Sequence, residues 1–340
     1  MKANLPDWLT DRCRQAEGNQ PVRLGSVMLV HHPEDVMHVL EAQQVFDKGA
    51  PVWDAVSDLL GSKSLITLPS STEEERVAWA EARANFAKRA EKLSEETLGW
   101  AADQFRASIE SKASTRSRLV DLELLTLQYT GSIIGRLWDV DDATMTQVLP
   151  RVHTAMGGMV RQMVSTLTPR PFDRVVRPST FARVCAELRE LLGQRHDELC
   201  TALAAGRDTV AAGLTWHLLR EPEPGEMPKS IARTLSLYPP IWFLPRQALA
   251  MVTLPSGARI KPRQLLVLLP YALQRLHPGS EMLAFGYGPR RCAGARPALR
   301  MIAAAAAVVT GFEFRPHGDR SPKGRITLWP ADPQSYVTKR

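Results

Sequence analysis

The stretch that decides the fold reads Phe285-Gly286-Tyr287-Gly288-Pro289-Arg290-Arg291-Cys292-Ala293-Gly294. It places one cysteine between glycines, directly before an apolar segment (295–309) that is expected to be a helix. Glycine permits tight turns and lets a flat ligand come close to the backbone. The helix N-terminus and the nearby Arg290, Arg291 and Arg296 favour the anionic form of the Cys292 sulfur. Such a thiolate suits ferric iron, and a purely structural cysteine in a glycine-rich turn is the alternative.

The same stretch resembles FxxGxRxCxG, the haem-binding signature of the cytochrome P-450 family. Its five fixed positions are all matched, by Phe285, Gly288, Arg290, Cys292 and Gly294. The resemblance implies the cytochrome P-450 fold and a haem b (iron protoporphyrin IX) cofactor whose iron is bound by Cys292. It also implies that Arg290 contacts a haem propionate and that Phe285 packs near the sulfur.

A second motif, Ala205-Gly206-Arg207-Asp208-Thr209, resembles the AGxDT pattern of the family's oxygen-activation helix, and the match continues through Trp216. The resemblance implies that Gly206 opens a gap in this helix over the iron. It further implies that Asp208 and Thr209 relay protons, for which a carboxylate and a hydroxyl are suited. The alternative is an ordinary helix start, with Asp208 or Thr209 as the N-cap of a helix that runs to Leu219.

Two further segments resemble the family's propionate contacts. The stretch 237–246 (LYPPIWFLPR) ends in Arg246, which could grip a carboxylate with two charge-assisted hydrogen bonds. Trp79 and Arg83 have the WxxxR spacing that places both on one face of a helix. The alternatives are a surface arginine on a strand for Arg246, and a salt-bridged helix face for Arg83, since Glu81 and other glutamates are near in sequence.

The resemblance covers about residues 22–328, but it has clear departures. The positions of the family's ExxR pair are occupied by Arg233 and Ser236, and His277-Pro278-Gly279 leads almost directly into the cysteine stretch. The segments around 222–233 and before Ala205 are also short, and Pro297 and Met301 replace the family's usual residues. These parts normally lock the core beneath the haem, so their loss bears on haem retention, stability and docking of a redox partner.

The overall pattern predicts a mainly α protein with a small β part, organised as one haem-thiolate domain over 1–340. Helical spacing is expected at 33–40, 86–109, 119–138, 180–203, 209–219 and 295–309. Strands are expected at 22–30, 246–252 and 265–269, the last two around the turn Pro255-Ser256-Gly257. The minor β part is assigned to 22–70 and 246–270, the distal helix to 205–219, and the haem loop with its helix to 285–309. Loops are expected at 169–178 and 221–228.

Composition limits the class of protein. The chain has 340 residues, 44% of them hydrophobic, and a formal net charge of +7 that is too diffuse to indicate nucleic acid binding. Its four cysteines, Cys13, Cys185, Cys200 and Cys292, have no metal-site spacing and suit a reducing compartment. Residues 1–21 are polar, and the longest apolar run, Met301–Val309, is too short for a membrane span. We therefore expect a soluble cytoplasmic protein.

Substrate and partner are expected only in outline. A stripe of Met156, Met159 and Met163 lies where the family places a lid over its pocket, although such a stripe is often plain core. A small hydrophobic or carrier-bound metabolite, as in secondary metabolite biosynthesis, is expected by analogy. The basic residues around the cysteine stretch suit an acidic ferredoxin or flavodoxin-type electron donor. They are Arg290, Arg291, Arg296 and Arg300.

Three functions are compatible with these features. The first is a monooxygenase that uses O₂ and two electrons to hydroxylate, epoxidise or desaturate its substrate. The second is a haem-thiolate enzyme that uses peroxide or catalyses an isomerisation or dehydration. The third is a degenerate haem-binding or interaction protein. The sequence favours the first, because both the cysteine signature and the AGxDT motif are intact.

Overall fold

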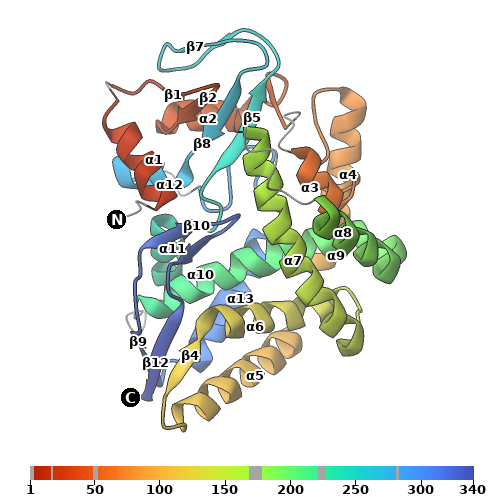
Figure 1. Ribbon diagram of the computed structural model, residues 1–340, viewed down its shortest axis with the longest axis vertical. Coiled ribbons are helices and arrows are strands. Elements are labelled where there is room, and N and C mark those ends of the chain that lie inside the picture. The colour runs from red at the N-terminus through yellow and green to blue at the C-terminus, as the bar shows by residue number, and fades with distance from the viewer. Residues whose placement is uncertain (1–3, 17, 49–52, 168–177, 221–226, 281–282) are drawn as a thin grey trace.

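The computed structural model describes residues 4–16, 18–48, 53–167, 178–220, 227–280 and 283–340. Helices make up most of it (Figure 1). The α-helices are α1 (Leu5–Arg14), α2 (Pro33–Glu41), α3 (Asp54–Leu60), α4 (Glu73–Ala90), α5 (Glu95–Ala113), α6 (Leu122–Leu137), α7 (Asp142–Leu167), α8 (Pro178–Leu192), α9 (His196–Thr201), α10 (Asp208–Leu219), α11 (Met227–Leu237), α12 (Pro270–Leu276) and α13 (Ala295–Val308). A 3₁₀ turn, η3 (Gly193–Arg195), precedes α9, and a π-helical turn, η4 (Ala202–Arg207), joins α9 to α10.

The strands are short. They are β1 (Val22–Leu24), β2 (Val27–Val30), β3 (Phe46–Asp47), β4 (Leu119–Asp121), β5 (Leu244–Ala248), β6 (Val252–Thr253), β7 (Arg259–Ile260), β8 (Leu265–Leu268), β9 (Phe312–Pro316), β10 (Pro322–Gly324), β11 (Leu328–Pro330) and β12 (Gln334–Lys339). The largest sheet has the order β1-β2-β8-β5-β3, in which β2 and β8 are parallel and the other pairs are antiparallel. A second sheet has the order β4-β12-β9, and β6–β7 and β10–β11 form separate pairs.

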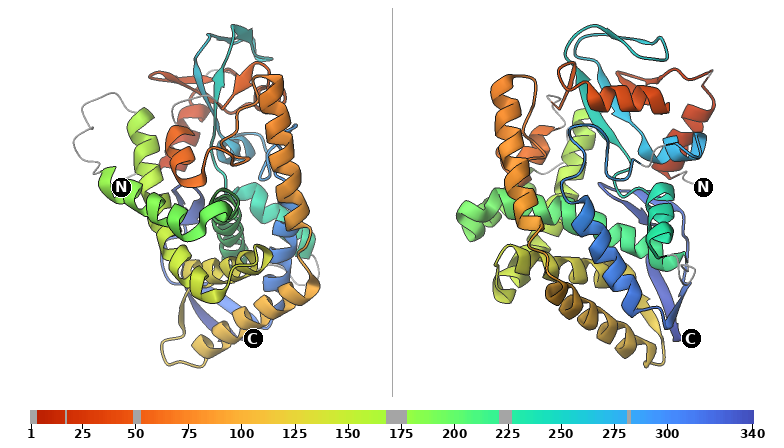
Figure 2. Two further views of the ribbon diagram at one scale, coloured as in Figure 1. Left: turned by 90° about the vertical axis from the view of Figure 1, so that its right-hand side faces the viewer. Right: turned by 180° about the vertical axis from the view of Figure 1, so that it is seen from behind.

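The elements divide into a strand-rich part and a helical part. In Figure 1 the five-stranded sheet lies at the top with α1, α2 and α12, while α5, α6, α10 and α13 lie below it with the β4-β12-β9 sheet. Helix α10 crosses the centre and contacts α6, α11 and α13. Figure 2 shows α4 along one side of the molecule. Almost every residue of α10 is buried, because neighbours cover it on all sides.

Local signals explain where the helices at the site begin. Helix α4 starts in a capping box, in which Thr72 accepts from the Glu75 amide and the Glu75 carboxylate accepts from the Thr72 amide. The predicted helical spacing over 86–109 belongs to two helices. Helix α4 ends at Ala90, and Ser94 is the N-cap of α5, where its hydroxyl accepts from the Thr97 amide. The predicted helix at 119–138 is confirmed as α6, except that its first residues form β4.

One expectation about elements was wrong and one alternative is excluded. The helix predicted at 180–203 is interrupted, because Gly193 adopts φ +51° and ends α8. The hairpin expected around 255–257 is confirmed in its antiparallel pairing of β5 with β8, although β5 ends at Ala248 and the separate short pair β6–β7 flanks the turn itself. The alternative of an N-cap at Asp208 is excluded, because Arg207 has helical φ and ψ and the helix runs on without a start.

Other elements carried no clear sequence signal. Helices α1 and α12 and the strands β9 to β12 were not predicted. In the lower sheet β12 pairs with β9 and also with β4, a strand that is distant in sequence, while β10 and β11 pair with each other. The loop predicted at 169–178 and most of the one at 221–228 lie outside the described residues.

Candidate active site

One large cavity, of about 350 Å³, lies between the two parts of the molecule. Its walls come from α4, α6, η4, the start of α10, β5 and the cysteine stretch. The sequence-predicted residues that line it are Trp79, Arg83, Gly206, Thr209, Arg246, Phe285, Arg290, Cys292 and Gly294. Residues from every motif singled out in the sequence therefore meet at one cavity, although Asp208 and Gly288 do not line it.

The backbone of the cysteine stretch folds into two tight turns. Gly286 and Gly288 adopt φ +70° and +67°, and the Cys292 amide donates to the Phe285 carbonyl over 2.8 Å. A Cβ at Gly288 would lie 2.9 Å from the Leu40 carbonyl oxygen, so both its dihedral angles and the space around it require glycine. Gly294 is the N-cap of α13. The loop thus presents Cys292 at the mouth of a helix, as predicted.

The electrostatics of Cys292 differ from the expectation in part. Cys292 is exposed at the cavity surface, but the protein atoms around it exclude part of the water and so raise the pKa of its thiol, while the Gly294 amide, Arg83 and Arg291 lower it. Arg290 and Arg296 do not contribute as predicted, because Arg290 turns toward Ser70 and Arg296 is exposed. Without a metal the thiol form is favoured, and metal binding would have to displace the proton.

Trp79 and Arg83 lie together beside this loop. Trp79 is buried, and the guanidinium of Arg83 lies 5.6 Å from its ring centroid. Arg83 donates to the Arg291 carbonyl, which ties α4 to the cysteine stretch. The guanidinium of Arg290 lies over the same ring at 4.9 Å. Arg83 has no ion pair among the described residues, which argues against the salt-bridged face considered above.

Three cations meet at one end of the cavity. They are Arg246, Arg290 and Lys48. Lys48 follows β3, and its Nζ donates to the Ile66 carbonyl over 2.7 Å. Burial and the other two cations hold the pKa of Lys48 well below its ordinary value. Burial lowers the pKa of both Arg246 and Arg290 to about 10. Asp47 is the carboxylate that acts on all three groups, so positive charge is in excess here.

This excess fits a ligand with carboxylates. The Nη1 atom of Arg290 is buried and has no hydrogen-bond partner within the described part of the chain. Arg246 is 5% exposed, and its Nη1 donates only to its neighbouring carbonyl at Pro245, over 2.8 Å. Buried cations are stable when anions pair with them. A haem, with a metal for Cys292 and propionates for these cations, matches the residues present.

Lys48 was missed by the sequence reasoning. No spacing joins it to the other cations, and the only local signal is a lone lysine after a buried aspartate at the end of β3.

The wall contributed by η4 and α10 carries the AGxDT motif. Residues Ala202–Arg207 form a π-helical turn, an arrangement that widens a helix and is frequent at functional sites. Thr209 is the next cavity residue, and its hydroxyl donates to the Ala205 carbonyl over 2.5 Å, with a weaker contact of 3.4 Å to the Gly206 carbonyl. The predicted irregularity at Gly206 is thus present as a π turn.

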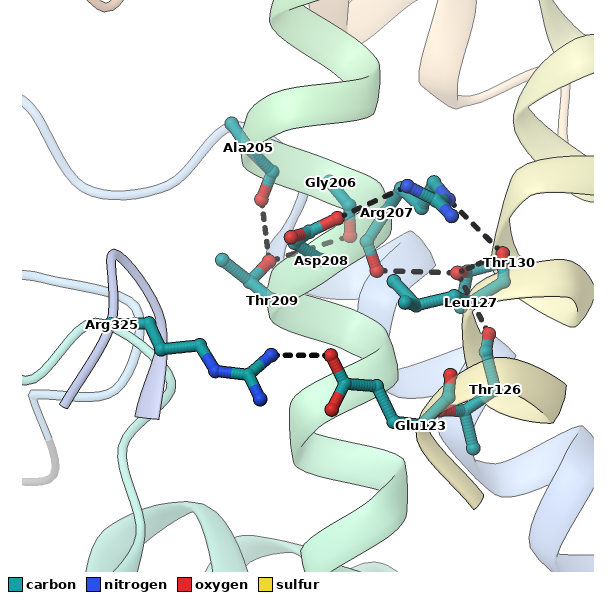
Figure 3. Close-up of polar contacts among 10 residues, drawn as sticks. All are labelled: Glu123, Thr126, Leu127, Thr130, Ala205, Gly206, Arg207, Asp208, Thr209 and Arg325. Atoms are coloured by element: carbon teal, nitrogen blue, oxygen red, sulfur yellow. Dashed lines mark hydrogen bonds and ion pairs between the residues drawn. The ribbon is translucent and has the colours of Figure 1, made fainter. Parts of the chain in front are cut away.

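Asp208 does not line the cavity, and its carboxylate faces the Arg207 guanidinium (Figure 3). Its carboxylate lies 3.4 Å from the Arg207 guanidinium, and both side chains are buried. Burial raises the pKa of Asp208 to about 6; Arg207 and Arg325 lower it, and Glu123 raises it. Glu123 of α6 pairs with Arg325, which lies between β10 and β11, at 2.5 Å. The sequence did not single out Glu123 or Arg325, because nothing local links them.

The methionine stripe divides between cavity and core. Met159 is buried and lines the cavity, whereas Met156 is buried in the core beside α8 and the side chain of Met163 lies outside the described part. The rest of that wall is apolar. It includes Val56, Leu60, Ile66, Phe86, Ile134 and Ala202.

The departures from the family pattern have local replacements. Ser236 donates to Gln274 over 2.6 Å, and Arg275 donates to the Leu237 carbonyl over 2.6 Å, so α11 and α12 are still joined. Arg233 is exposed. Pro297 and Met301 both line the cavity, and the Met301 carbonyl accepts from the Tyr129 hydroxyl over 2.8 Å.

Comparison with known proteins decides the fold. A cytochrome P450 from Thermus thermophilus, described as six-coordinated, superposes with a TM-score of 0.71 at 21% identity and covers 99% of each chain. The chain has the cytochrome P450 fold. The fold that the resemblance implied and the predicted class, mainly α with a small β part, are thereby confirmed.

Curated relatives point in the same direction. The chain is 24% identical to pentalenene oxygenase of Streptomyces avermitilis, over 80% of this chain and 78% of that protein. It is also 24% identical to cyclooctatin synthase of Streptomyces melanosporofaciens, over 80% and 77%. Both names are those of enzymes, in agreement with the predicted oxidoreductase. No family profile matches the chain.

Two kinds of feature are absent from the described part of the chain, a membrane-spanning helix and a cluster of metal-binding side chains. Among the described residues, no helix combines the length and the apolar character needed to cross a bilayer. Within the same part of the chain, no three His, Cys, Asp or Glu side chains are grouped so that they could hold a metal ion.

Proposed function

We propose that the chain is a haem-thiolate monooxygenase that inserts one oxygen atom of O₂ into a small apolar substrate. The observation that carries this proposal is the meeting of Cys292, three cations (Lys48, Arg246 and Arg290) and the π-helical turn with Thr209 at one cavity. A thiolate ligand, propionate partners and a distal hydroxyl are the three parts that the chemistry requires. O₂, two electrons and two protons are consumed, and the second oxygen atom leaves as water.

The cofactor in this proposal is haem b. Cys292 would be the iron ligand, and Arg246, Arg290 and Lys48 would hold the propionates, with Trp79 and Arg83 beside them. Bound haem supplies oxygen activation at the iron. The protein side chains orient it, neutralise its carboxylates and exclude water from the pocket.

On the distal side, Thr209 would move protons at its hydroxyl. That hydroxyl donates to the Ala205 carbonyl, so it has free acceptor positions toward the cavity. Asp208 would supply the proton from the opposite face of the helix. The π turn at Gly206 would provide space between the helix and the substrate.

The substrate is proposed to be a compact hydrocarbon-like metabolite. Phe86, Ile134 and Met159 offer hydrophobic contacts to a substrate in the cavity. One relative is named as the oxygenase of pentalenene, and a comparable apolar intermediate of secondary metabolism would suit this lining. A carrier-bound substrate remains the alternative within the same proposal.

A carbon monoxide difference spectrum of the reduced, haem-loaded protein tests the proposal. A thiolate-bound haem gives a strongly red-shifted Soret band, and Cys292→Ala should abolish that band while the protein remains folded. Cys13→Ala is the matched control, because Cys13 is buried within α1 and does not line the cavity. A protein that takes up no haem would contradict the proposal.

The electron source distinguishes this proposal from a peroxide-dependent enzyme. Product formed with O₂ and a reduced ferredoxin or flavodoxin, at a rate above that with hydrogen peroxide, is expected. Product formed with peroxide alone would favour the second function.

A further inference from the structure

Arg207, the variable residue of the AGxDT motif, is fixed to α6 at both ends. Its Nε donates to the Leu127 carbonyl over 3.1 Å, and its own carbonyl accepts from the Thr130 hydroxyl over 3.2 Å (Figure 3). The side chain is 6% exposed, and burial lowers its pKa. A buried arginine held on both its side chain and its backbone fixes the last residue of the π turn against the neighbouring helix.

The same guanidinium holds Asp208. The two side chains form an ion pair at 3.4 Å, and Asp208, 8% exposed, does not line the cavity although Thr209 does. The charged groups that act on Asp208 are Arg207 in the helix, Glu123 on α6 and Arg325 between β10 and β11. Asp208 therefore does not face the cavity, is held by Arg207, and lies within electrostatic reach of Glu123 and Arg325.

We propose that Arg207 is a positioning residue that anchors the π turn to α6 and holds the Asp208 carboxyl turned out of the cavity, toward Glu123 and Arg325. This inference rests on the proposed function, in which Asp208 supplies protons to the distal side. Asp208 then gains its proton at the face shared with Glu123. It reaches the cavity only when its carboxyl leaves Arg207.

Two opposite shifts follow from the charges. Without the positive charge of Arg207, the carboxylate of Asp208 loses its closest stabilising partner, so its pKa rises. Without the negative charge of Glu123, both Arg207 and Arg325 act on Asp208 without a competing carboxylate, so its pKa falls. An opposite charge at this distance changes a carboxyl pKa by about one unit or more.

The test is an infrared titration of the protonated carboxyl band that disappears in Asp208→Asn. The parent band should titrate near pH 6. In Arg207→Gln, which keeps an amide donor for Leu127 but removes the charge, the midpoint should rise by about one unit or more. In Glu123→Gln the midpoint should fall, and in Arg207→Lys, which keeps the charge, it should stay near that of the parent.

Arg106→Met, which removes an exposed cation paired with Glu110 on α5, is the control and should leave the midpoint unchanged. An unchanged midpoint in Arg207→Gln, or an equal rise in Arg207→Lys, overturns the proposal. If Arg207→Gln does not fold, Glu123→Gln decides it, because an unchanged or raised midpoint there contradicts the arrangement.

The haem-loaded enzyme gives a second readout. The acid limb of the pH profile for coupling of reduction to product should move with the infrared midpoint in each variant. Because the titration does not need haem, shifted midpoints in a protein without a thiolate-haem spectrum would refute the proposed function and leave the Arg207 arrangement intact.

Discussion

At the scale of single residues, the chemistry depends on side chains whose charge is decided by burial. Burial raises the pKa of the Cys292 thiol and lowers that of Lys48, so both groups are disfavoured in their charged forms without a partner. A cofactor that supplies both a cation for the sulfur and anions for the lysine satisfies each group. This reciprocity is the physical basis for expecting haem binding and folding to support each other.

Thr209→Ala should separate electron uptake from product formation. Its hydroxyl is the nearest protic group to the cavity on this helix, so its loss should increase hydrogen peroxide release and decrease product per electron consumed. The measurement compares reductant consumed, peroxide and product. Thr209→Ser keeps a hydroxyl and should retain most of the coupling, whereas full coupling in Thr209→Ala would exclude the assigned role.

Lys48→Met should have opposite effects on the haem-free and haem-loaded protein. The haem-free protein should be at least as stable as the parent, because a buried cation that Arg246 and Arg290 repel is removed. Haem affinity should fall by about tenfold or more, as expected for one lost charge-assisted hydrogen bond. Urea denaturation and haem titration measure the two effects.

Lys63→Met, which changes an exposed lysine, is the control for both measurements. A Lys48→Met protein with weakened folding and unaltered haem affinity would argue for a structural lysine instead.

At the scale of elements, the region beneath the cysteine stretch is held by contacts other than the family's ExxR pair. Ser236 and Gln274 join α11 to α12, and Arg275 lies 3.4 Å from the Tyr271 ring centroid while donating to the Leu237 carbonyl. Neutral and cation–π contacts thus replace an ion pair at this junction. The segment after α12 begins at His277, which packs against the start of α2.

Acid should loosen this junction through a group of three histidines. The rings of His31 and His277 stack at 6.1 Å, and the ring of His32 meets His277 edge-on at 5.1 Å. Burial, and the other histidine rings, lower the pKa of His31 and His277; Asp35 and the Gln20 backbone oppose this for His31. The folded protein therefore favours the neutral histidines. Because their folded-state pKa lies below 6.5, this contribution to the free energy of unfolding is complete above pH 6.5 and is lost as the pH falls through the lowered pKa.

His31→Phe keeps a ring but cannot be protonated, so it should lose less stability than the parent between pH 7 and pH 5. Urea midpoints at the two pH values measure the difference. His153→Gln, at an exposed position, should behave like the parent. Equal losses in His31→Phe and the parent would show that other groups control acid sensitivity.

At the scale of the whole molecule, the net charge of +7 is expected to guide an acidic electron donor. Arg291 and Arg296 are exposed around the cysteine stretch, whereas Arg300 is already paired with Glu95 at 2.5 Å. Arg290 belongs with Lys48 and Arg246 to the group of cations at the cavity. The predicted patch of four arginines is therefore reduced to two that can meet a partner.

Arg296→Glu should slow reduction by an acidic ferredoxin several-fold at low ionic strength, with a smaller effect at high salt, because salt screens exposed charges. Stopped-flow reduction of the carbon monoxide complex measures the rate. Lys261→Glu makes the same charge change after β7, in the upper part of Figure 1, and should have less effect. An equal effect of both variants would point to net charge instead of a docking face.

The sequence by itself determined the class of the fold and which residues to propose for the site. The cysteine signature and the AGxDT motif lie within single turns, where spacing alone decides which residues are adjacent, so Cys292, Gly288 and Thr209 could be proposed from the chain. The same reasoning failed where neighbours come from distant segments, as with Gly193 within a long helical pattern and the strands that pair with β4.

Only the tertiary structure decided which charges meet. Lys48, Arg246 and Arg290 lie far apart in the sequence, and so do Glu123, Arg207 and Arg325, yet each group is brought together by packing of helices against sheets. Packing also keeps Asp208 out of the cavity lining and against Arg207, an orientation that the AGxDT motif does not predict. Burial of these charges sets their pKa values, and burial is a property of the folded chain as a whole.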